Sequence, residues 1–374
     1  MPEFEKWWND LKKHQKRCDH WLPHWKAVAG QIGNAREIRY FTLCARSMID
    51  VFMLVREKLI ALDPENYSIS SIRFCECDTE QFAEINDLIA REDAGIFGRL
   101  EEVVLFKDDD FTAQCPTLAS ITAKLEDERL QDDYTQIDRL QLKRTHIEVV
   151  ATFPYDFINL DFCDYYYPEP PDMLRINETV KSVLDWQRRS SEDGQKVRLD
   201  EFILAVTCRH DDKFPKPAED RLVALVEENC ATSNYYKEQL VKTRGTAEVQ
   251  KWLGSDRQDF FFAGWPKDIG RSAKEYGWSM EVLDYVYYER LGDHDNTYVI
   301  ACLVARFKRT NSNPDYLKAA LHALDAKKRQ LIGDVDPASK DGQRLLKNLE
   351  DVVVLRNEQA RRKNRPELPD PRTA

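Results

Sequence analysis

Residues 157–172, FINLDFCDYYYPEPPD, combine an apolar run with aspartates, tyrosines and a proline cluster. The apolar run predicts a buried strand over 157–162, which places Asp161 at the strand end, where ligands of a parallel sheet collect. A carboxylate at that place suits the orientation of a substrate, and Asp164 is a second candidate for the same role. The alternative is that Asp161 caps the turn where the strand leaves the sheet. The tyrosines Tyr165–Tyr167 either stack on a nucleobase or pack over helix ends.

A second group of candidate residues is the pattern H-x3-C-x-H-x3-H formed by His14, Cys18, His20 and His24. Zinc sites use these residue types. However, Pro23 interrupts the helical spacing, and no second cluster with a recognised zinc spacing supports it. We therefore interpret these residues as surface histidines on a tryptophan-rich helix and predict no metal.

The bulk composition excludes several classes of protein. The net charge of −11 argues against a broad basic face for duplex nucleic acid. No run of 18 uncharged apolar residues is present, so no membrane span is predicted. The first residues contain no apolar signal core, which predicts a cytoplasmic protein. The nine cysteines are scattered without a CxxC pair, as expected for reduced thiols.

Apolar, β-prone runs alternate with amphipathic stretches along the middle of the chain. Alternation of this kind predicts βαβ units, a mainly parallel sheet and helices on both of its faces. Thr79 is the expected N-cap of the second helix. The expected strands are 38–45, 70–78, 101–106, 157–162 and 201–208. The expected helices are 46–60, 79–92, 116–143, 173–189 and 218–233.

The alternation stops in the last third of the chain. Two strand-like runs, 280–290 and 297–308, are joined by the short connector LGDHDNT and should therefore pair antiparallel. Helical segments are expected at 1–35, with a break near Pro23, and at 311–374. The predicted fold is a three-layer α/β domain whose mainly parallel sheet is closed by an antiparallel hairpin, with helices at both ends of the chain.

This order of elements resembles the Rossmann-like S-adenosylmethionine-dependent methyltransferases, whose seven-stranded sheet has an antiparallel last strand reached through a hairpin. The resemblance covers 36–310, with 232–277 as an insert. It implies that the turn after the first strand holds the methionine part of S-adenosylmethionine. It also implies that an acid after the second strand holds the ribose, that an acid after the third lies near the adenine, and that an acid after the fourth orients the methyl acceptor. The corresponding residues are Cys44, Ala45 and Ser47; Glu76 and Asp78; Asp109; and Asp161 and Asp164.

The sequence departs from the family pattern at two places. The turn TLCARSMID has no glycine, and Arg46 stands where a glycine would let the backbone approach the cofactor. The segment after Asp161 lacks the Pro-Pro spacing of the methyltransferases that act on nucleic-acid amines. Asp109 belongs to a run of three aspartates, 108–110, which also suits a solvated loop. Phe111, which follows the run, is a candidate for stacking on the base.

Two functions follow from the resemblance. The first is methyl transfer from S-adenosylmethionine to a nucleic acid or another acceptor, which Glu76 and Asp161 favour. The second is a catalytically degenerate methyltransferase-fold protein that binds a protein or nucleic acid partner, which the missing glycines favour. A looser likeness to the three-Cys-motif partner proteins connects the second function with bacterial antiviral defence. The insert 232–277 mixes basic and aromatic residues, so it either contacts single-stranded nucleic acid or packs on the sheet edge.

Overall fold

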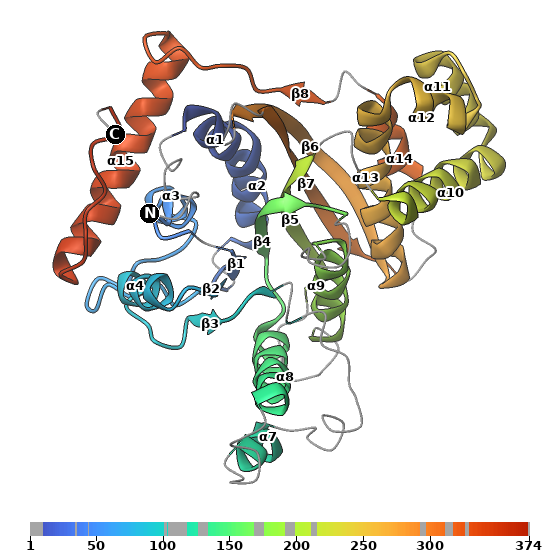
Figure 1. Ribbon diagram of the computed structural model, residues 1–374. Helices are drawn as coiled ribbons and strands as arrows, with labels where there is room; N and C mark the ends of the chain where they lie inside the picture. Colours follow the sequence, from blue (N-terminus) through green and yellow to red (C-terminus); the bar gives the residue numbers. More distant parts are fainter. Residues whose placement is uncertain are drawn as a thin grey trace.

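The computed structural model describes residues 10–33, 36–43, 45–100, 103, 118–125, 134–167, 176–190, 199–210, 215–291, 297–310, 317–325 and 329–372. Within these residues the centre of the fold is an eight-stranded sheet with the order β3-β2-β1-β4-β5-β7-β6-β8 (Figure 1). The strands are β1 (Tyr40–Thr42), β2 (Ile72–Glu76), β3 (Gly95–Phe97), β4 (Phe157–Tyr165), β5 (Glu201–His210), β6 (Trp278–Leu291), β7 (Thr297–Arg309) and β8 (Gln330–Leu331).

The direction of the strands agrees with the sequence prediction. Strands β1 to β5 pair in parallel, whereas β7 lies between β5 and β6 and runs antiparallel to both. The strand order reverses between β1 and β4. In open α/β sheets, ligands bind outside the carboxyl ends of the strands at such a reversal. The fold therefore places a candidate site at the ends of β1 and β4.

Helices cover both faces of the sheet. The N-terminal helices, α3 and α15 contribute to the core on one face, whereas α9, α10 and α13 contribute to the core on the other. The helices are α1 (Leu11–Gln15), the π-helix η2 (Lys16–Trp21), α2 (Leu22–Ile32), α3 (Ile49–Arg56), α4 (Thr79–Ile89), α7 (Leu118–Leu125), α8 (Tyr134–Thr152), α9 (Ile176–Ser190), α10 (Lys216–Thr232), α11 (Asn234–Arg244), α12 (Val249–Ser255), α13 (Arg257–Glu275), α14 (Leu317–Leu324) and α15 (Lys340–Arg362).

The tryptophan-rich N-terminal helices pack directly on the sheet. The ring of Trp25 stacks on Phe157 with 5.5 Å between centroids, and it meets Tyr40 edge-on at the same distance. The indole nitrogen of Trp21 donates to Sγ of Cys302 at 3.1 Å. Burial of large aromatic rings is a dominant contribution to core stability. The first helices are therefore part of the same core as the sheet.

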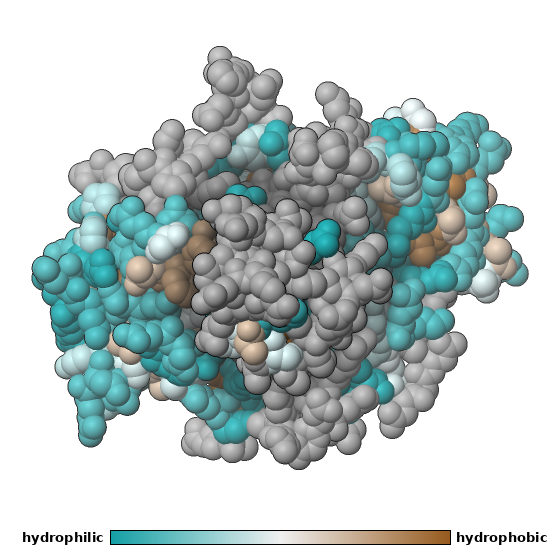
Figure 2. Space-filling view, turned by 60° about the horizontal axis from the view of Figure 1, so that its bottom comes forward, coloured by the Kyte–Doolittle hydropathy of each residue, from teal (hydrophilic) through white to brown (hydrophobic). Residues whose placement is uncertain are grey.

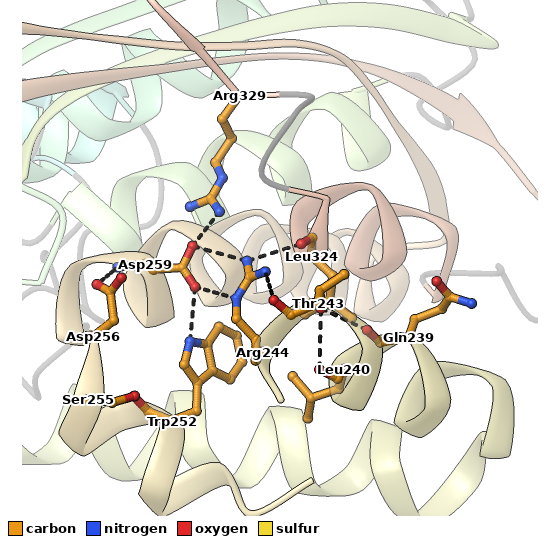
Figure 3. A network of polar contacts seen from close by, with 10 residues as sticks. All are labelled: Gln239, Leu240, Thr243, Arg244, Trp252, Ser255, Asp256, Asp259, Leu324 and Arg329. Atoms are coloured by element: carbon orange, nitrogen blue, oxygen red, sulfur yellow. Dashed lines mark hydrogen bonds and ion pairs between the residues drawn. The ribbon is translucent and has the colours of Figure 1, made fainter. Parts of the chain in front are cut away.

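Helices α10 to α14 form a helical lobe on one flank of the sheet, whereas α15 lies on the opposite flank beside α3 (Figure 1). A network of ion pairs ties the lobe together (Figure 3). The carboxylate of Asp259 pairs with Arg244 and Arg329 and accepts the indole N–H of Trp252 at 2.9 Å. Arg244 also donates to the carbonyl of Leu324 at 3.0 Å. One carboxylate thus joins α11, α12, α13 and the segment before β8.

Three local predictions are wrong. The third strand is Gly95–Phe97 and not 101–106, of which the described residue, Val103, is helical and packs in the core. The helix does not break at Pro23, because the π-helix η2 continues directly into α2 and Pro23 lies at this junction, where the helical hydrogen-bond pattern changes. The N-cap of α4 is Asp78 instead of Thr79, because the carboxylate of Asp78 accepts from the backbone N–H of Gln81. The two-residue strand β8 was not predicted.

Candidate functional site

The turn after β1 is held in place by ion pairs. The backbone N–H of Met48 donates to the carbonyl of Ala45, and Met48 has a left-handed φ of 51°. Ser47 is buried. The side chain of Arg46, which replaces the expected glycine, pairs with the buried Glu84 of α4 at 2.5 Å. Glu84 also faces Arg356 of α15 at 3.4 Å. Arg46 therefore connects the turn with α4, and Glu84 connects α4 with α15. Cys44 lies outside the described residues.

Glu76 ends β2 and turns back on its own backbone. Its Oε1 accepts from the N–H groups of Cys77 and Asp78 at 2.7 and 2.8 Å. These two bonds fix the orientation of the carboxylate, which stands at the carboxyl end of the sheet as predicted. The carboxylate of Asp78 is already engaged as the helix cap of α4. Of the two acids, Glu76 is therefore the better candidate for holding a ligand.

The aromatic ring beside Glu76 is Phe97, which the sequence analysis missed. Glu76 and Phe97 are register partners in the parallel pair β2–β3. The ring of Phe97 is 49 % exposed and meets Phe82 edge-on with 5.5 Å between centroids. An exposed phenylalanine at the end of a strand, supported by a second ring, offers a flat surface for stacking. The expected residues Asp109 and Phe111 lie outside the described residues.

Asp161 lies in the middle of β4 and not at its end as predicted, because the strand continues to Tyr165. Two lysines of the N-terminal helices engage its carboxylate. Nζ of Lys13 lies 3.2 Å from Oδ2, and Nζ of Lys16 lies 3.5 Å from Oδ1. Lys16 also donates to Oγ1 of Thr207 in β5 at 3.1 Å. Burial favours a higher pKa for the Asp161 carboxyl, but Lys13, Lys16 and Arg17 outweigh it and hold that pKa well below its usual range. Asp161 is thus ionised at neutral pH.

A buried polar cluster lies on the same side of the sheet as Asp161. The hydroxyl of Tyr40 donates to Oδ2 of Asp50 at 2.6 Å, and Thr42 donates to the same atom at 3.1 Å. The amide of Asn159 donates to this carboxylate at 3.3 Å, whereas its Oδ1 has no partner among the described residues. Asn159 and Asp161 share one face of β4 because side chains alternate along a strand. This spacing is the signal that could have identified Asn159.

The other candidates of the segment 157–172 are Asp164 and the tyrosines that follow it. Asp164 belongs to β4, where the register shifts between Asp161 and Tyr165, but the position of its side chain is not described. Tyr166 and Tyr167 are buried. Their rings contact Trp265 and Phe261 of α13. These two tyrosines therefore pack under the helical lobe, in agreement with the packing interpretation.

The prediction of surface histidines is wrong for His14 and His20, which are buried. The four residues of the pattern lie in two separate groups. His14 lies 3.3 Å from Sγ of Cys18, whereas His20 and His24 both face Asp284 of β6, at 2.7 and 3.8 Å. Within the described part of the chain, no three His, Cys, Asp or Glu residues are grouped so that they could hold a metal ion.

The insert predicted at 232–277 is helical. Most of its aromatic residues are in the core, whereas Tyr235 is 57 % exposed. Trp252, Phe260 and Trp265 are at most 1 % exposed. Their rings are therefore not available for stacking on a nucleic acid. A pocket opens between α10, α11 and α12, lined by residues that include Cys230 and Val249. Figure 2 shows hydrophobic surface among the hydrophilic residues of the helical lobe, at the right of the view.

The described helices include none that is both long and apolar enough to cross a membrane. Comparison of the chain with protein-family models, with curated proteins and with solved structures finds no match.

Proposed function

We propose that the protein binds S-adenosylmethionine at the carboxyl ends of β1 to β4 and transfers its methyl group. The observation that carries this proposal is the pairing of Glu76 with Phe97 at the ends of adjacent parallel strands. A carboxylate of fixed orientation and an exposed ring, side by side, have the chemistry needed to hold a ribose and a base. The reversal of strand order between β1 and β4 supports the same location.

The residues present fit the nucleoside part of the cofactor best. The carboxylate of Glu76 accepts hydrogen bonds only, so it can bind both ribose hydroxyls. The ring of Phe97 would stack on the adenine. The methionine part would lie against the turn Ala45–Ser47. In this turn the side chain of Arg46 is directed toward α4, where it pairs with Glu84.

S-adenosylmethionine supplies an electrophilic methyl group, and the protein must position the acceptor in line with it. In our proposal Asp161 orients the acceptor through its ionised carboxylate, which can accept a hydrogen bond from an amine or hydroxyl. On the same face of β4, Oδ1 of Asn159 has no partner within the described part of the chain. Positioning and electrostatic complementarity account for much of the catalysis in such transfers.

A second candidate function is a binding protein that has the methyltransferase fold but no activity. One observation favours it: Lys13 and Lys16 of the same chain already occupy the carboxylate of Asp161. An acceptor would have to share that carboxylate with two ammonium groups. In this alternative the ion pairs serve to attach the N-terminal helices to the sheet.

Calorimetric titration of S-adenosylmethionine and S-adenosylhomocysteine into the purified protein tests the proposal. We expect binding that weakens at least about tenfold in Glu76→Ala and in Phe97→Ala, the loss of one charge-assisted contact or one stacking partner. Glu80→Ala removes an exposed acid from the first turn of α4 and is the matched control. No heat at millimolar ligand would rule out the cofactor. Binding with unchanged affinity in both Glu76→Ala and Phe97→Ala would rule out the proposed site.

The two candidate functions separate in a transfer assay. S-adenosylmethionine carrying a labelled methyl group is incubated with the protein and with nucleic acid or protein acceptors. The proposed enzyme transfers label, and Asp161→Asn loses most of that transfer while cofactor affinity stays unchanged. Cofactor binding without transfer to any acceptor supports the second candidate.

A further inference from the structure

Arg17 is a buried basic residue whose guanidinium is only partly accounted for by the described residues. It lies in the π-helix η2 and is 5 % exposed. Its Nε and Nη1 atoms are buried, and neither has a hydrogen-bond partner among the described residues. Burial of an arginine is costly unless an anion or hydrogen-bond acceptors compensate it. The position therefore calls for a negatively charged group.

Arg17 belongs to a cluster of cationic side chains around one carboxylate. Lys13 and Lys16 pair with Asp161, and the charge of Arg17 also acts on that carboxyl to lower its pKa. His14 adds no charge, because burial and the neighbouring Arg17 lower its pKa to about 3. Two basic side chains thus contact Asp161, and the charge of a third, Arg17, also acts on it. The cluster can accept a further anion.

The cluster lies at the edge of the proposed acceptor site. Lys16 bridges β4 and β5 through Asp161 and Thr207, which are register partners. The side chains of Lys13 and Asp161 keep 17 % and 15 % of their exposure, so this edge of the cluster is open to solvent. Lys16 and Arg17 lie deeper. An anion entering beside Asp161 would therefore meet Lys13 first.

We propose that Lys13, Lys16 and Arg17 form a binding site for a phosphate group of the methyl acceptor, beside Asp161. The planar fork of a guanidinium matches the oxygens of a phosphate, and the two ammonium groups add point charges. The inference rests on the proposed function, because it assigns the acceptor to the nucleotides or nucleic acids. The phosphate site itself does not depend on the cofactor.

The overall charge of the protein agrees with a local site of this kind. At a net charge of −11 the molecule does not attract polyanions over long distances. Recognition of a phosphate must therefore come from close, partly buried contacts, which salt screens less than surface contacts. A cluster with two of its three basic side chains buried satisfies this condition.

Calorimetric titration of sodium pyrophosphate, without S-adenosylmethionine and at constant ionic strength, tests the site. The decisive variant is Arg17→Gln, and Arg17→Lys keeps the charge but not the fork. Lys26→Gln removes a cation of α2 that pairs with the distant Glu57, and it serves as the control. We expect pyrophosphate binding in the wild type and in Lys26→Gln. Loss of the fork contacts should weaken it at least about tenfold in Arg17→Gln and less in Arg17→Lys.

Lys13→Gln provides a second variant on the open edge of the cluster, in case Arg17→Gln does not fold. It should also weaken pyrophosphate binding. The absence of binding to the wild type overturns the inference, as does equal affinity in the wild type, Arg17→Gln and Lys13→Gln. Adenosine monophosphate and a single-stranded oligonucleotide then distinguish a free nucleotide from a strand. If the protein binds pyrophosphate but not S-adenosylmethionine, the phosphate site is supported and the proposed function is wrong.

Discussion

Nζ of Lys16 lies 3.5 Å from Oδ1 of Asp161, across a separation of 145 residues in the sequence. The lysine side chain is fully buried, whereas the aspartate keeps a small exposed area. Burial favours a lower pKa for Lys16, and the charge of Asp161 counteracts that shift. This pair connects the N-terminal π-helix with the middle of β4. It therefore serves the stability of the fold as well as the proposed site.

We expect Asp161→Asn to destabilise the protein by about 3 kcal/mol, because it leaves the buried ammonium group of Lys16 without a counter-charge. The midpoint of urea unfolding, followed by circular dichroism, measures the effect. Asp19→Asn is the matched control: Asp19 pairs with Arg344 at the surface, and loss of such a pair costs under about 1 kcal/mol. Equal shifts in the two variants would contradict a buried, energetically important pair.

The pair between Asp284 and His20 predicts a pH dependence of stability. Burial favours a higher pKa for the Asp284 carboxyl, but the hydrogen bonds from His20 and His24 outweigh it and lower that pKa to about 2. A carboxyl whose pKa is lowered in the folded state stabilises the protein at pH values above its pKa in the unfolded chain, which is near 3.9. That stability is lost as the pH falls from about 4 to about 2.

Thermal unfolding of the wild type and of Asp284→Asn between pH 5 and pH 2.5 measures this contribution. The difference in stability between the two proteins should shrink by up to about 2 kcal/mol as the pH falls. Other carboxyls titrate in both proteins and cancel in the comparison. A difference that stays constant over this range would show that Asp284 does not depend on its histidine partners.

The order of strands and helices could be predicted because the central elements are long. Strands β4 to β7 each contain nine or more residues, so their apolar runs are visible in the sequence. The short connector between β6 and β7 indicated the antiparallel hairpin. Strand β3 contains three residues, one of them a glycine, and no periodicity can be recognised over such a length.

The candidate site could be predicted only in part, for a related physical reason. Glu76 ends β2 as predicted from the apolar run before it, whereas Asp161 lies inside β4, which runs three residues further than the predicted strand. The position of Asp161 on the chain was identified, but its contacts were not, because Lys13 and Lys16 come from a helix almost 150 residues away, and no local pattern encodes that contact. The role of Asp78 as a helix cap was missed because the neighbouring Thr79 also has a side chain that can cap a helix.

The carboxylate of Asp259 is expected to control the stability of the helical lobe. Asp259→Asn removes the counter-charge of Arg244 and Arg329, whose side chains are mostly buried, and should cost roughly 3–5 kcal/mol. Asp256→Ala removes the nearby N-cap of α13, whose loss costs about 1 kcal/mol, and is the comparison. Hydrogen exchange of α11 to α14 should accelerate much more in Asp259→Asn. Equal acceleration in both variants would mean that the ion-pair network adds nothing beyond helix capping.

The buried amine of Lys267 in α13 should lower the stability of the protein at neutral pH. Its side chain is fully buried, and Nζ has no hydrogen-bond partner among the described residues. Burial lowers the pKa of Lys267 to about 7, although Glu228 acts in the opposite direction. Between about pH 7 and pH 10, Lys267 is therefore protonated in the unfolded chain and mostly deprotonated in the folded protein. The resulting penalty is complete below pH 7 and disappears as the pH rises toward 10.

Lys267→Met should remove this penalty and stabilise the protein by up to roughly 4 kcal/mol at pH 6.5, with little gain at pH 9.5. Urea unfolding midpoints at the two pH values measure the gain. Lys237→Met changes an exposed lysine of the neighbouring α11 and should have no comparable effect. A destabilised Lys267→Met would mean that the amine has a partner in the folded protein. A gain independent of pH would mean that packing, and not the charge of Lys267, accounts for the difference.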